Sequence, residues 1–496
     1  MSPHRLSKSR YMSGHQCHLR LWYDVNERHL MRPVSETQQA IFDTGHEVGD
    51  LACERYPGGH LVAHDYRHIP AALAETQRLI REDTAPALFE PAFRHNGVLA
   101  RVDVLERIPD GGWRMIEVKS TTRCKPEHIL DAAVQLWVLR GAGLDIRDAG
   151  VLTLNREYIY DGIHLDLDAL FKFDSVLDEA DALLDSIGTD VAEMQAMLAA
   201  ESAPDIQPSR HCLKPYTCPY FEHCTRNIPQ PEHGIGELSG INSERREELE
   251  AMGITEVRDV PANFPLNELQ SIIRQAVIDG SDTVHGDLAR SLAEMSPPVR
   301  HLDFESFQLA IPRFAGTCPY DQIPFLFSVH TELGEASLES VDYIHEDDGD
   351  PRPHLIESLL EALGEEGSIC TYSSFERTQL RALAAAFPQY ADALGDIVER
   401  LVDLLPILRG SYYHPSFHGS FSIKAVLPVV APELGYDDLE IADGQLASVR
   451  YARALAIASP SERRQTFDSL RAYCARDTLA MVELRNALLA VARSGA

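Results

Sequence analysis

The sequence predicts a protein of the α/β class that contains more than one domain. Two observations lead to this prediction. Short segments in which apolar and polar residues alternate, as in strands, are interleaved with segments of helical periodicity in both halves of the chain. The chain also has 496 residues, and one hydrophobic core seldom serves a chain of this length. Two or three domains are therefore expected.

The composition is that of an ordinary globular protein, with 44% hydrophobic and 24% charged residues. The formal net charge of −31 disfavours binding to nucleic acid through overall charge alone, because both partners would be polyanions. It is compatible with local basic grooves, and enzymes that use divalent metals need clustered carboxylates. Residues 1–20 lack the apolar core of a signal peptide, and no apolar run reaches the ~20 residues that span a bilayer. These features predict a cytoplasmic protein without a membrane partner.

The first half of the chain predicts a helix, a β-hairpin and a further α/β unit. Ser35 is a suitable N-cap for the first helix, and Pro57-Gly58-Gly59 ends it. The turn over residues 109–112 separates the two strands of the hairpin. The predicted elements are a helix over 35–56, strands over 98–108 and 113–118, a helix over 127–140, a strand over 151–154 and helices to about residue 200.

The second half begins with a mostly helical region between Pro229 and Pro298, which predicts a connecting domain. From residue 299 the pattern changes, and it predicts strands over 299–304, 323–332, 338–344 and 367–372, followed near the end by one or two helices over 461–493. The chain has no phosphate-binding loop of the G-x-x-x-x-G-K-[ST] type, so a built-in helicase motor is not expected.

Three ionisable residues of the predicted hairpin form the first candidate site. Glu117 and Lys119 are two residues apart in a strand, so their side chains point to the same face. Asp103 joins them if the pairing register places it opposite Glu117 or Lys119. Two carboxylates can hold a divalent cation that activates water, the lysine can orient that water, and His46 could supply a further ligand. The alternative is an exposed strand with ordinary surface charges, but the chain has only six lysines.

With these residues the sequence resembles the RecB-type PD-(D/E)XK nucleases, especially the CRISPR-adaptation exonucleases and related iron–sulfur nucleases. The resemblance covers residues 1–228 and implies a restriction-endonuclease-like fold that uses Mg²⁺ or Mn²⁺. The family's helical histidine, strand aspartate, E-x-K pair and helical glutamine fall on His46, Asp103, Glu117, Lys119 and Gln135. Glu90 is a candidate for an acidic position upstream. Ala100 stands where a glycine often precedes the aspartate, and Leu139 stands where a tyrosine often follows the glutamine.

Four of the nine cysteines form a second pattern. Cys212, Cys218 and Cys224 are spaced C-x5-C-x5-C, and Cys17 lies far upstream. Four thiolates suit either a [4Fe-4S] cluster or a zinc ion, but the tight C-x2-C pairs typical of structural zinc are missing. One distant cysteine with three grouped ones is similar to the iron–sulfur nucleases, which implies a [4Fe-4S] cluster. The alternative is that all four are structural thiols.

A third pattern lies in the second half of the chain. Asp303 and Glu305 share one face of a predicted strand, and Tyr473 and Asp477, four residues apart, share one face of a predicted helix. Glu376 follows the strand that ends at residue 372. Acidic residues from a strand and a helix can hold the two metal ions of phosphodiester cleavage, while a tyrosine positions the attacking water.

This pattern resembles the tyrosine-bearing DEDD exonucleases of the RNase H-like superfamily. The region from about Arg300 to the end also resembles an uncharacterised bacterial family that is often fused to iron–sulfur nucleases of the RecB type. Glu376 stands where aspartate is usual and Ser373 where asparagine is common, so Asp403 is kept as a reserve ligand. The alternative is a degenerate, purely structural RNase H-like domain.

The sequence thus predicts a PD-(D/E)XK nuclease domain with an iron–sulfur cluster over 1–228, a helical connector over 229–298, and an RNase H-like exonuclease domain over 299–496. The expected activity is metal-dependent hydrolysis of DNA, with single-stranded DNA as the first candidate substrate and RNA as the second. Two other functions are weighed against it: a catalytically decayed nucleic-acid-binding or scaffold protein that keeps the cluster, and an iron–sulfur redox sensor that binds partners without cleavage.

Overall fold

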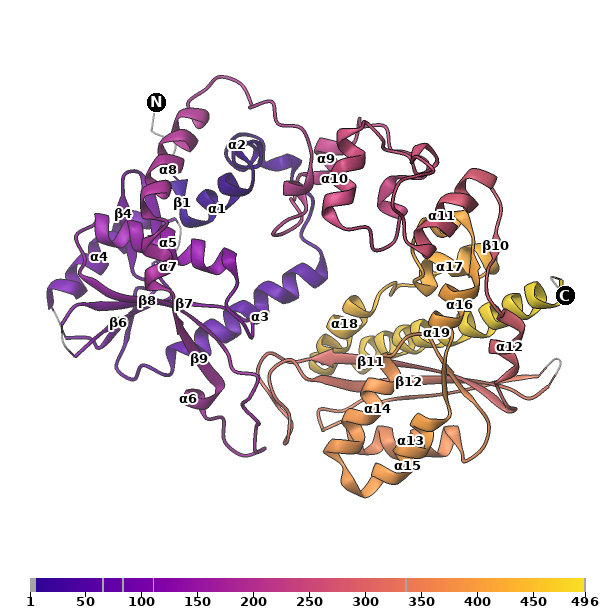
Figure 1. The fold of residues 1–496 in the computed structure, drawn as a ribbon. Helices are drawn as coiled ribbons and strands as arrows, with labels where there is room; N and C mark the ends of the chain where they lie inside the picture. The colour runs from indigo at the N-terminus through magenta and orange to yellow at the C-terminus, as the bar shows by residue number, and fades with distance from the viewer. Residues whose placement is uncertain (1–5, 65–66, 83, 110, 335–336, 495–496) are drawn as a thin grey trace. The chain divides into compact units, whose positions relative to one another are not determined.

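The computed structural model describes residues 6–64, 67–82, 84–109, 111–334 and 337–494. The chain divides into two compact units (Figure 1). Unit 1 comprises residues 1–228 and 309–321, and unit 2 comprises residues 229–308 and 322–496. Helices alternate with mixed sheets in both units, so the predicted α/β class is confirmed.

Unit 1 is built on a six-stranded sheet in the order β2-β3-β6-β7-β8-β9, with a smaller sheet in the order β1-β5-β4. Its strands are β1 (Leu6–Ser7), β2 (His60–Leu61), β3 (Ala87–Phe89), β4 (Ala92–His95), β5 (Val98–Arg101), β6 (Val104–Arg107), β7 (Trp113–Val118), β8 (Ile146–Leu154) and β9 (Phe171–Ser175). Its helices are α1 (Lys8–Gln16), α2 (His18–Asn26), α3 (Glu36–Cys53), α4 (Ile69–Glu82), α5 (Pro126–Gly141), α6 (Leu167–Leu170), α7 (Leu177–Asp181), α8 (Leu184–Leu198) and α9 (Phe221–Thr225).

The six-stranded sheet has a hydrophobic core on each face, because successive strand residues point in opposite directions. In β7, Met115 belongs to the same hydrophobic core as Val134 of α5, and Ile116 belongs to the same core as Val48 of α3. Both cores are therefore needed to hold β7, the strand that carries Glu117, between two helices.

The predicted strand over 98–108 is interrupted, and its two halves lie in different sheets. β5 pairs with β1 and β4, whereas β6 pairs with β7. The chain bends at Asp103, whose carboxylate Oδ2 accepts a hydrogen bond of 2.7 Å from the backbone N–H of Val118. At the bend, strand pairing is interrupted, and the Asp103 side chain forms a hydrogen bond at the end of β7 instead.

The 309–321 segment lies between two strands of unit 2 in sequence, yet it packs in unit 1. Ala310 is buried in the same core as Val48 and Ile116. The backbone N–H of Tyr160 donates to the carbonyl of Thr317 at 3.0 Å, and the Tyr320 hydroxyl donates to the carbonyl of Ser120. This segment therefore completes one core of unit 1 beside the end of β7.

Unit 2 contains a five-stranded sheet in the order β13-β12-β11-β14-β15 and a short pair, β10 with β16. The strands are β10 (Thr283–Val284), β11 (Val299–Gln308), β12 (Gln322–Glu332), β13 (Leu338–Ile344), β14 (Ile369–Thr371), β15 (Leu401–Asp403) and β16 (Tyr412–Tyr413). The helices are α10 (Ser243–Ala251), α11 (Glu268–Asp279), α12 (Leu288–Ala293), α13 (Arg352–Leu363), α14 (Phe375–Ala386), α15 (Ala391–Glu399), α16 (Leu404–Ser411), α17 (Ile423–Val430), α18 (Gly444–Ala456) and α19 (Pro460–Ser494).

The two faces of β11 differ in what covers them. Leu302 and Phe304 pack in a core with residues of α13, α14 and α15. Asp303, which points to the opposite face, contacts Cys474 of α19. The predicted tail is a single helix, and α19 brings its polar residues to the acidic face of β11.

The helical region over 229–298 shares a hydrophobic core with the rest of unit 2. Leu249, Ile273 and Leu292 from this region belong to the same cluster as Leu404 and Leu484. The apolar residues of the predicted connector therefore belong to one hydrophobic cluster with residues of α16 and α19, and α12 packs directly on both of these helices.

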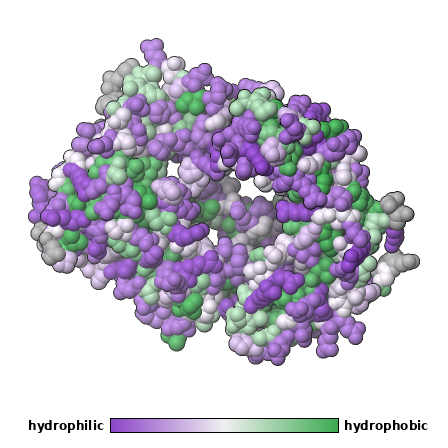
Figure 2. Space-filling model, in the orientation of Figure 1, coloured by the Kyte–Doolittle hydropathy of each residue, from purple (hydrophilic) through white to green (hydrophobic). Residues whose placement is uncertain are grey.

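The face seen in Figure 2 is mostly hydrophilic, with apolar residues in small separate patches. Among the helices that the structure describes, none has the length and apolar composition needed to cross a membrane.

Candidate metal centres

Glu117, at the end of β7, lies at the centre of a charged cluster in unit 1. Its carboxylate is 2% exposed and accepts hydrogen bonds from Lys119 at 2.6 Å, Lys8 at 2.7 Å and Gln135 at 2.6 Å. Burial alone would raise the pKa of Glu117, but the charges of Lys8 and Lys119 outweigh this effect and lower the pKa. The two lysines therefore favour the ionised form of Glu117.

Asp103 is the second carboxylate of this cluster. The pairing of β6 with β7 ends at Val104 opposite Ile116, so Asp103 and Glu117 are the next residues along the two strands. This is the even register that a shared site requires. Burial, followed by the negative charge of Glu117, raises the pKa of Asp103 to about 8. Two carboxylates thus share one environment, and a cation would relieve their repulsion.

Two members of the cluster were not among the predicted site residues. Asp131 of α5 accepts hydrogen bonds from Lys119 at 2.6 Å and lies 3.2 Å from the Lys8 ammonium. Asp131 precedes Gln135 by one helical turn, which puts both on the same face of α5. Lys8 carried no such local signal, because it lies 109 residues from Glu117 in the sequence.

Of the two other predicted residues of this site, Gln135 lies in the charged cluster, whereas His46 forms no hydrogen bond with its carboxylates among the described residues. Gln135 contacts Glu117 directly, and its Oε1 atom is buried without a hydrogen-bond partner among the described residues. His46 is exposed on α3, and no hydrogen bond or ion pair in the described ranges joins it to Asp103 or Glu117. Glu90, the candidate for an upstream acidic position, instead pairs with Arg101 at 3.1 Å.

The second cluster lies in unit 2, where Asp303, Glu305 and Asp477 offer ligand atoms that all lie within 4.8 Å of one another. Two come from β11 and one from α19, so strand and helix converge as the sequence pattern predicted. Glu305 and Asp477 are buried, and Asp303 is partly buried. Burial, together with the charge of Asp477, raises the pKa of both Asp303 and Glu305, the latter to about 8.

Glu376, from the first turn of α14, belongs to the same electrostatic environment. Its side chain is 2% exposed, and its Oε2 atom has no hydrogen-bond partner in the described part of the chain. Burial, followed by the charges of Asp403 and Asp477, raises the pKa of Glu376 to about 8. A buried carboxylate oxygen without a partner is costly unless a proton or a cation satisfies it, so the donor set fits a metal ion.

The carboxylate of Asp403, the reserve ligand, forms hydrogen bonds with backbone N–H groups. Its Oδ1 atom accepts hydrogen bonds from the N–H groups of Ser373 at 2.8 Å and Leu405 at 2.9 Å, so it caps α16. Ser373 has a φ of 109°, a conformation that L residues rarely adopt. Asp403 therefore stabilises the turn that leads to Glu376.

Tyr473 lies beside the carboxylates with a lysine that was not predicted. Lys424 of α17 donates to the Tyr473 hydroxyl at 3.0 Å and to the carbonyl of Ala442 at 2.5 Å. Burial, followed by the charge of Asp477, raises the pKa of Tyr473, so its hydroxyl keeps its proton. Asp477 also accepts a hydrogen bond from the Tyr436 hydroxyl.

The four predicted cysteine ligands meet around one small cavity in unit 1, formed by Cys17, Cys212, Cys218 and Cys224 with the surrounding aromatic and aliphatic residues. Burial, followed by repulsion from the thiolate forms of the other three cysteines, raises the pKa of Cys224 to about 11. Gln16 ties the two segments together, because its amide donates to the carbonyls of His211 and Tyr216, both at 2.7 Å. The distant cysteine is thus held beside the grouped ones.

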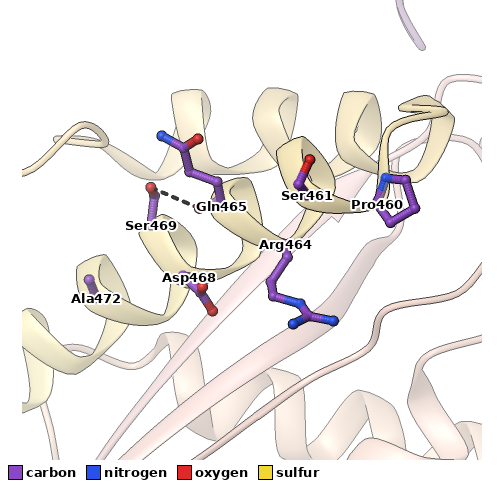
Figure 3. A pocket seen from close by; sticks show the side chains of 7 residues that line it. All are labelled: Pro460, Ser461, Arg464, Gln465, Asp468, Ser469 and Ala472. Carbon is purple, nitrogen blue, oxygen red and sulfur yellow. Dashed lines mark hydrogen bonds between the residues drawn. The ribbon is translucent and has the colours of Figure 1, made fainter.

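A separate surface depression of about 590 Å³ runs along the first turns of α19 (Figure 3). Its lining comes from one helix and includes Arg464 and Asp468, while the Ser469 hydroxyl donates to the backbone carbonyl of Gln465. It contains none of the candidate ligands, so it is not part of the carboxylate cluster.

In the comparisons with known proteins, part of the chain matches a family model of unknown function. Residues 300–422 match the "Domain of unknown function (DUF2779)". The matched range includes Asp303, Glu305 and Glu376 but ends before Tyr473 and Asp477. No match was found among the curated proteins. The crystal structure of SSO0001 is similar over 40% of this chain and 78% of that chain, at 15% sequence identity and a TM-score of 0.18, which is too weak a likeness to assign a fold.

Proposed function

We propose that the chain is a divalent-metal-dependent nuclease with two active sites, a PD-(D/E)XK-like site in unit 1 and a DEDD-exonuclease-like site in unit 2. The substrate we propose first is single-stranded DNA, with RNA as the second choice. The observation that carries the proposal is the convergence of Asp303, Glu305 and Asp477, whose ligand atoms lie within 4.8 Å of one another. Glu376 contributes a further buried carboxylate, whose Oε2 atom has no hydrogen-bond partner among the described residues and whose charge acts on Asp303. Such a set is costly to a metal-free protein but suits a site for two divalent cations.

In unit 2, Asp303, Glu305, Asp477 and Glu376 would hold Mg²⁺ or Mn²⁺. When bound, these ions would polarise the scissile phosphate and lower the pKa of the attacking water. Tyr473 keeps its proton, so its hydroxyl can position that water by a hydrogen bond. Lys424 holds the tyrosine oxygen in place and offsets part of the negative charge of the site.

In unit 1, Asp103 and Glu117 would hold the metal ion, and His46 stays a proposed further ligand. Gln135 fixes the orientation of the Glu117 carboxylate. Lys8 and Lys119 supply two positive charges beside Asp103, Glu117 and Asp131, which lets a phosphate group approach an otherwise anionic site. We propose that Lys119, which lies directly after β7 and two residues from Glu117, is the lysine that orients water.

For the cysteines we propose a [4Fe-4S] cluster. The support is that Cys17, Cys212, Cys218 and Cys224 line one cavity, although Cys17 is far from the other three in sequence. Four thiolates around one cavity suit such a cluster, and the tight C-x2-C pairs typical of structural zinc are missing from the sequence.

The proposal is tested with the full-length protein, purified anaerobically. Single-stranded DNA, duplex DNA and RNA, each labelled at the 5′ end, are incubated with Mg²⁺ or Mn²⁺, and the released products are resolved by length. Metal-dependent shortening is expected in the wild type and should be absent from a Glu117→Gln, Asp303→Asn double variant. Tight binding of the same strands without any cleavage, under every metal condition, would favour the decayed scaffold protein.

Tyr473→Phe provides a sharper test of the site in unit 2. The substitution removes only the hydroxyl that would position water, so we expect turnover to fall by about 10²-fold. The affinity for Mn²⁺, measured by calorimetry, should stay unchanged because the carboxylates remain. Tyr436→Phe is the matched control, since that hydroxyl also contacts Asp477. Equal losses in both variants would contradict a specific role for Tyr473.

A further inference from the structure

A different set of potential ligands lies elsewhere in unit 2. His233, Glu237 and His418 offer ligand atoms that all lie within 4.8 Å of one another. The Nδ1 atom of His233 is 2.9 Å from one carboxylate oxygen of Glu237, and the Nδ1 atom of His418 is 3.0 Å from the other. The two imidazole rings stack with their centroids 5.1 Å apart. Both rings therefore present the same nitrogen to a single carboxylate.

The first two residues are held by a turn with little freedom. The backbone N–H of His233 donates to Glu256 at 3.1 Å, and its carbonyl accepts from Val257 at 2.8 Å. Glu237 ends the short 3-10 helix η3 (Ile235–Glu237), where its N–H donates to the carbonyl of Gly234 at 2.8 Å. His233 and Glu237 are 13% exposed, so their side chains have few alternative positions.

The third residue is brought in by a close approach of two backbones. A Cβ atom on Gly419 would lie 2.0 Å from the carbonyl oxygen of Glu237, so only glycine fits there. His418 itself has a left-handed backbone with a φ of 48°, a conformation that costs a non-glycine residue on the order of 1 kcal/mol. With this strained backbone, the His418 ring faces Glu237.

We propose that His233, Glu237 and His418 form a binding site for a transition-metal ion of the Zn²⁺ class. Two imidazoles and one carboxylate are the donors that zinc and its neighbours prefer, whereas Mg²⁺ prefers oxygen ligands alone. One donor atom from each of the three residues lies within 4.8 Å of the other two, and the His233 Nδ1 atom lies 2.9 Å from a Glu237 oxygen, near the ~3.3 Å edge of a tetrahedron around zinc. This site rests on none of the nuclease residues and stands apart from the proposed function.

Three protein ligands leave one position for water or another small ligand. His418 is 58% exposed and lines a surface depression of about 600 Å³, together with Tyr372, Arg409 and Phe421. The fourth position would therefore be open to solvent. The ion would also link two segments that are 181 residues apart, the start of unit 2 and the end of the DUF2779 match. Closing so long a loop stabilises the folded state.

The experiment uses the full-length protein with its cysteines loaded with iron and sulfide and its carboxylates saturated with Mg²⁺. Zinc is then titrated by calorimetry, and the thermal unfolding midpoint is followed. The variants are Glu237→Gln, which keeps the side-chain shape, and His418→Asn, which keeps a residue that tolerates the left-handed backbone. His354→Asn is the control, because His354 is 71% exposed on α13 and pairs within its own helix.

Wild type and His354→Asn are expected to bind one equivalent of zinc and to unfold at a higher temperature once it is bound. Both site variants should bind this zinc at least ~10-fold more weakly, since even residues that only support a ligand cost this much when they are lost. If all four proteins bind zinc alike, or none of them does, the proposal is overturned. The three residues would then form a hydrogen-bonded latch in which Glu237 bridges two imidazole N–H groups.

Discussion

Asp303→Asn is expected to remove the activity of unit 2 while leaving its fold intact. Asparagine has the same shape but no negative charge, so it cannot replace a carboxylate between two cations. Because a metal ion contributes several kcal/mol to the transition state, nucleotide release from the 3′ end should fall by on the order of 10³-fold. Products from labelled single strands measure the loss, and activity that depends on Glu117 should persist.

The stability of the same variant separates a catalytic role from a structural one. The pKa of Asp303 is raised, so its ionised form opposes folding at neutral pH in the metal-free protein. Removing that charge should leave the chelated variant at least as stable as the chelated wild type. Added Mn²⁺ should then stabilise the wild type more than the variant. A chelated variant that unfolds at a clearly lower temperature would show that Asp303 supports the fold instead.

Cys17→Ser should have the largest effect on the cofactor. The anaerobic wild type is expected to be brown and to carry about four iron atoms and four acid-labile sulfides per chain, and the variant should lose most of both. Cys17 lies directly after α1, the helix that starts with Lys8, so cluster loss should also weaken the charged site around Glu117. Iron analysis, absorption spectra and cleavage assays measure these effects.

Cys124→Ser is the matched control for this prediction, since Cys124 is a partly exposed cysteine of the same unit outside the cavity. It should keep its iron, its colour and its activity. A colourless wild type with one tightly held zinc ion would overturn the cluster. Full iron loading of Cys17→Ser would instead remove Cys17 from the ligand set.

The local parts of the fold could be read from the sequence. Strand alternation gave the β6–β7 hairpin, and the two-residue period placed Glu117 and Lys119 on one face. Helical periodicity placed Tyr473 and Asp477 one turn apart on what proves to be a single long helix. These features depend on neighbours in the chain, where periodicity is informative.

The remaining features depend on contacts between distant segments. Lys8 and Glu117 are 109 residues apart, and Lys424 and Tyr473 are 49 apart, so no local pattern could pair them. The predicted 98–108 strand is broken at Asp103, whose side chain contacts the backbone of Val118. Strand propensity describes only local sequence, so it could not predict this contact. The helices over 229–298 looked independent because their covering partners, including Leu484, lie near the other end of the chain.

The 309–321 segment has a consequence for how the protein is made. Unit 1 takes its first 228 residues from the start of the chain, but Ala310 and Tyr320 complete one of its cores. During synthesis, that core stays unfinished until the ribosome has passed β11, the first long strand of unit 2. Newly made unit 1 would therefore expose apolar surface on α3 and β7 while the intervening residues are translated, which makes it a candidate client for chaperones. A fragment that ends at residue 228 would keep that exposed surface permanently.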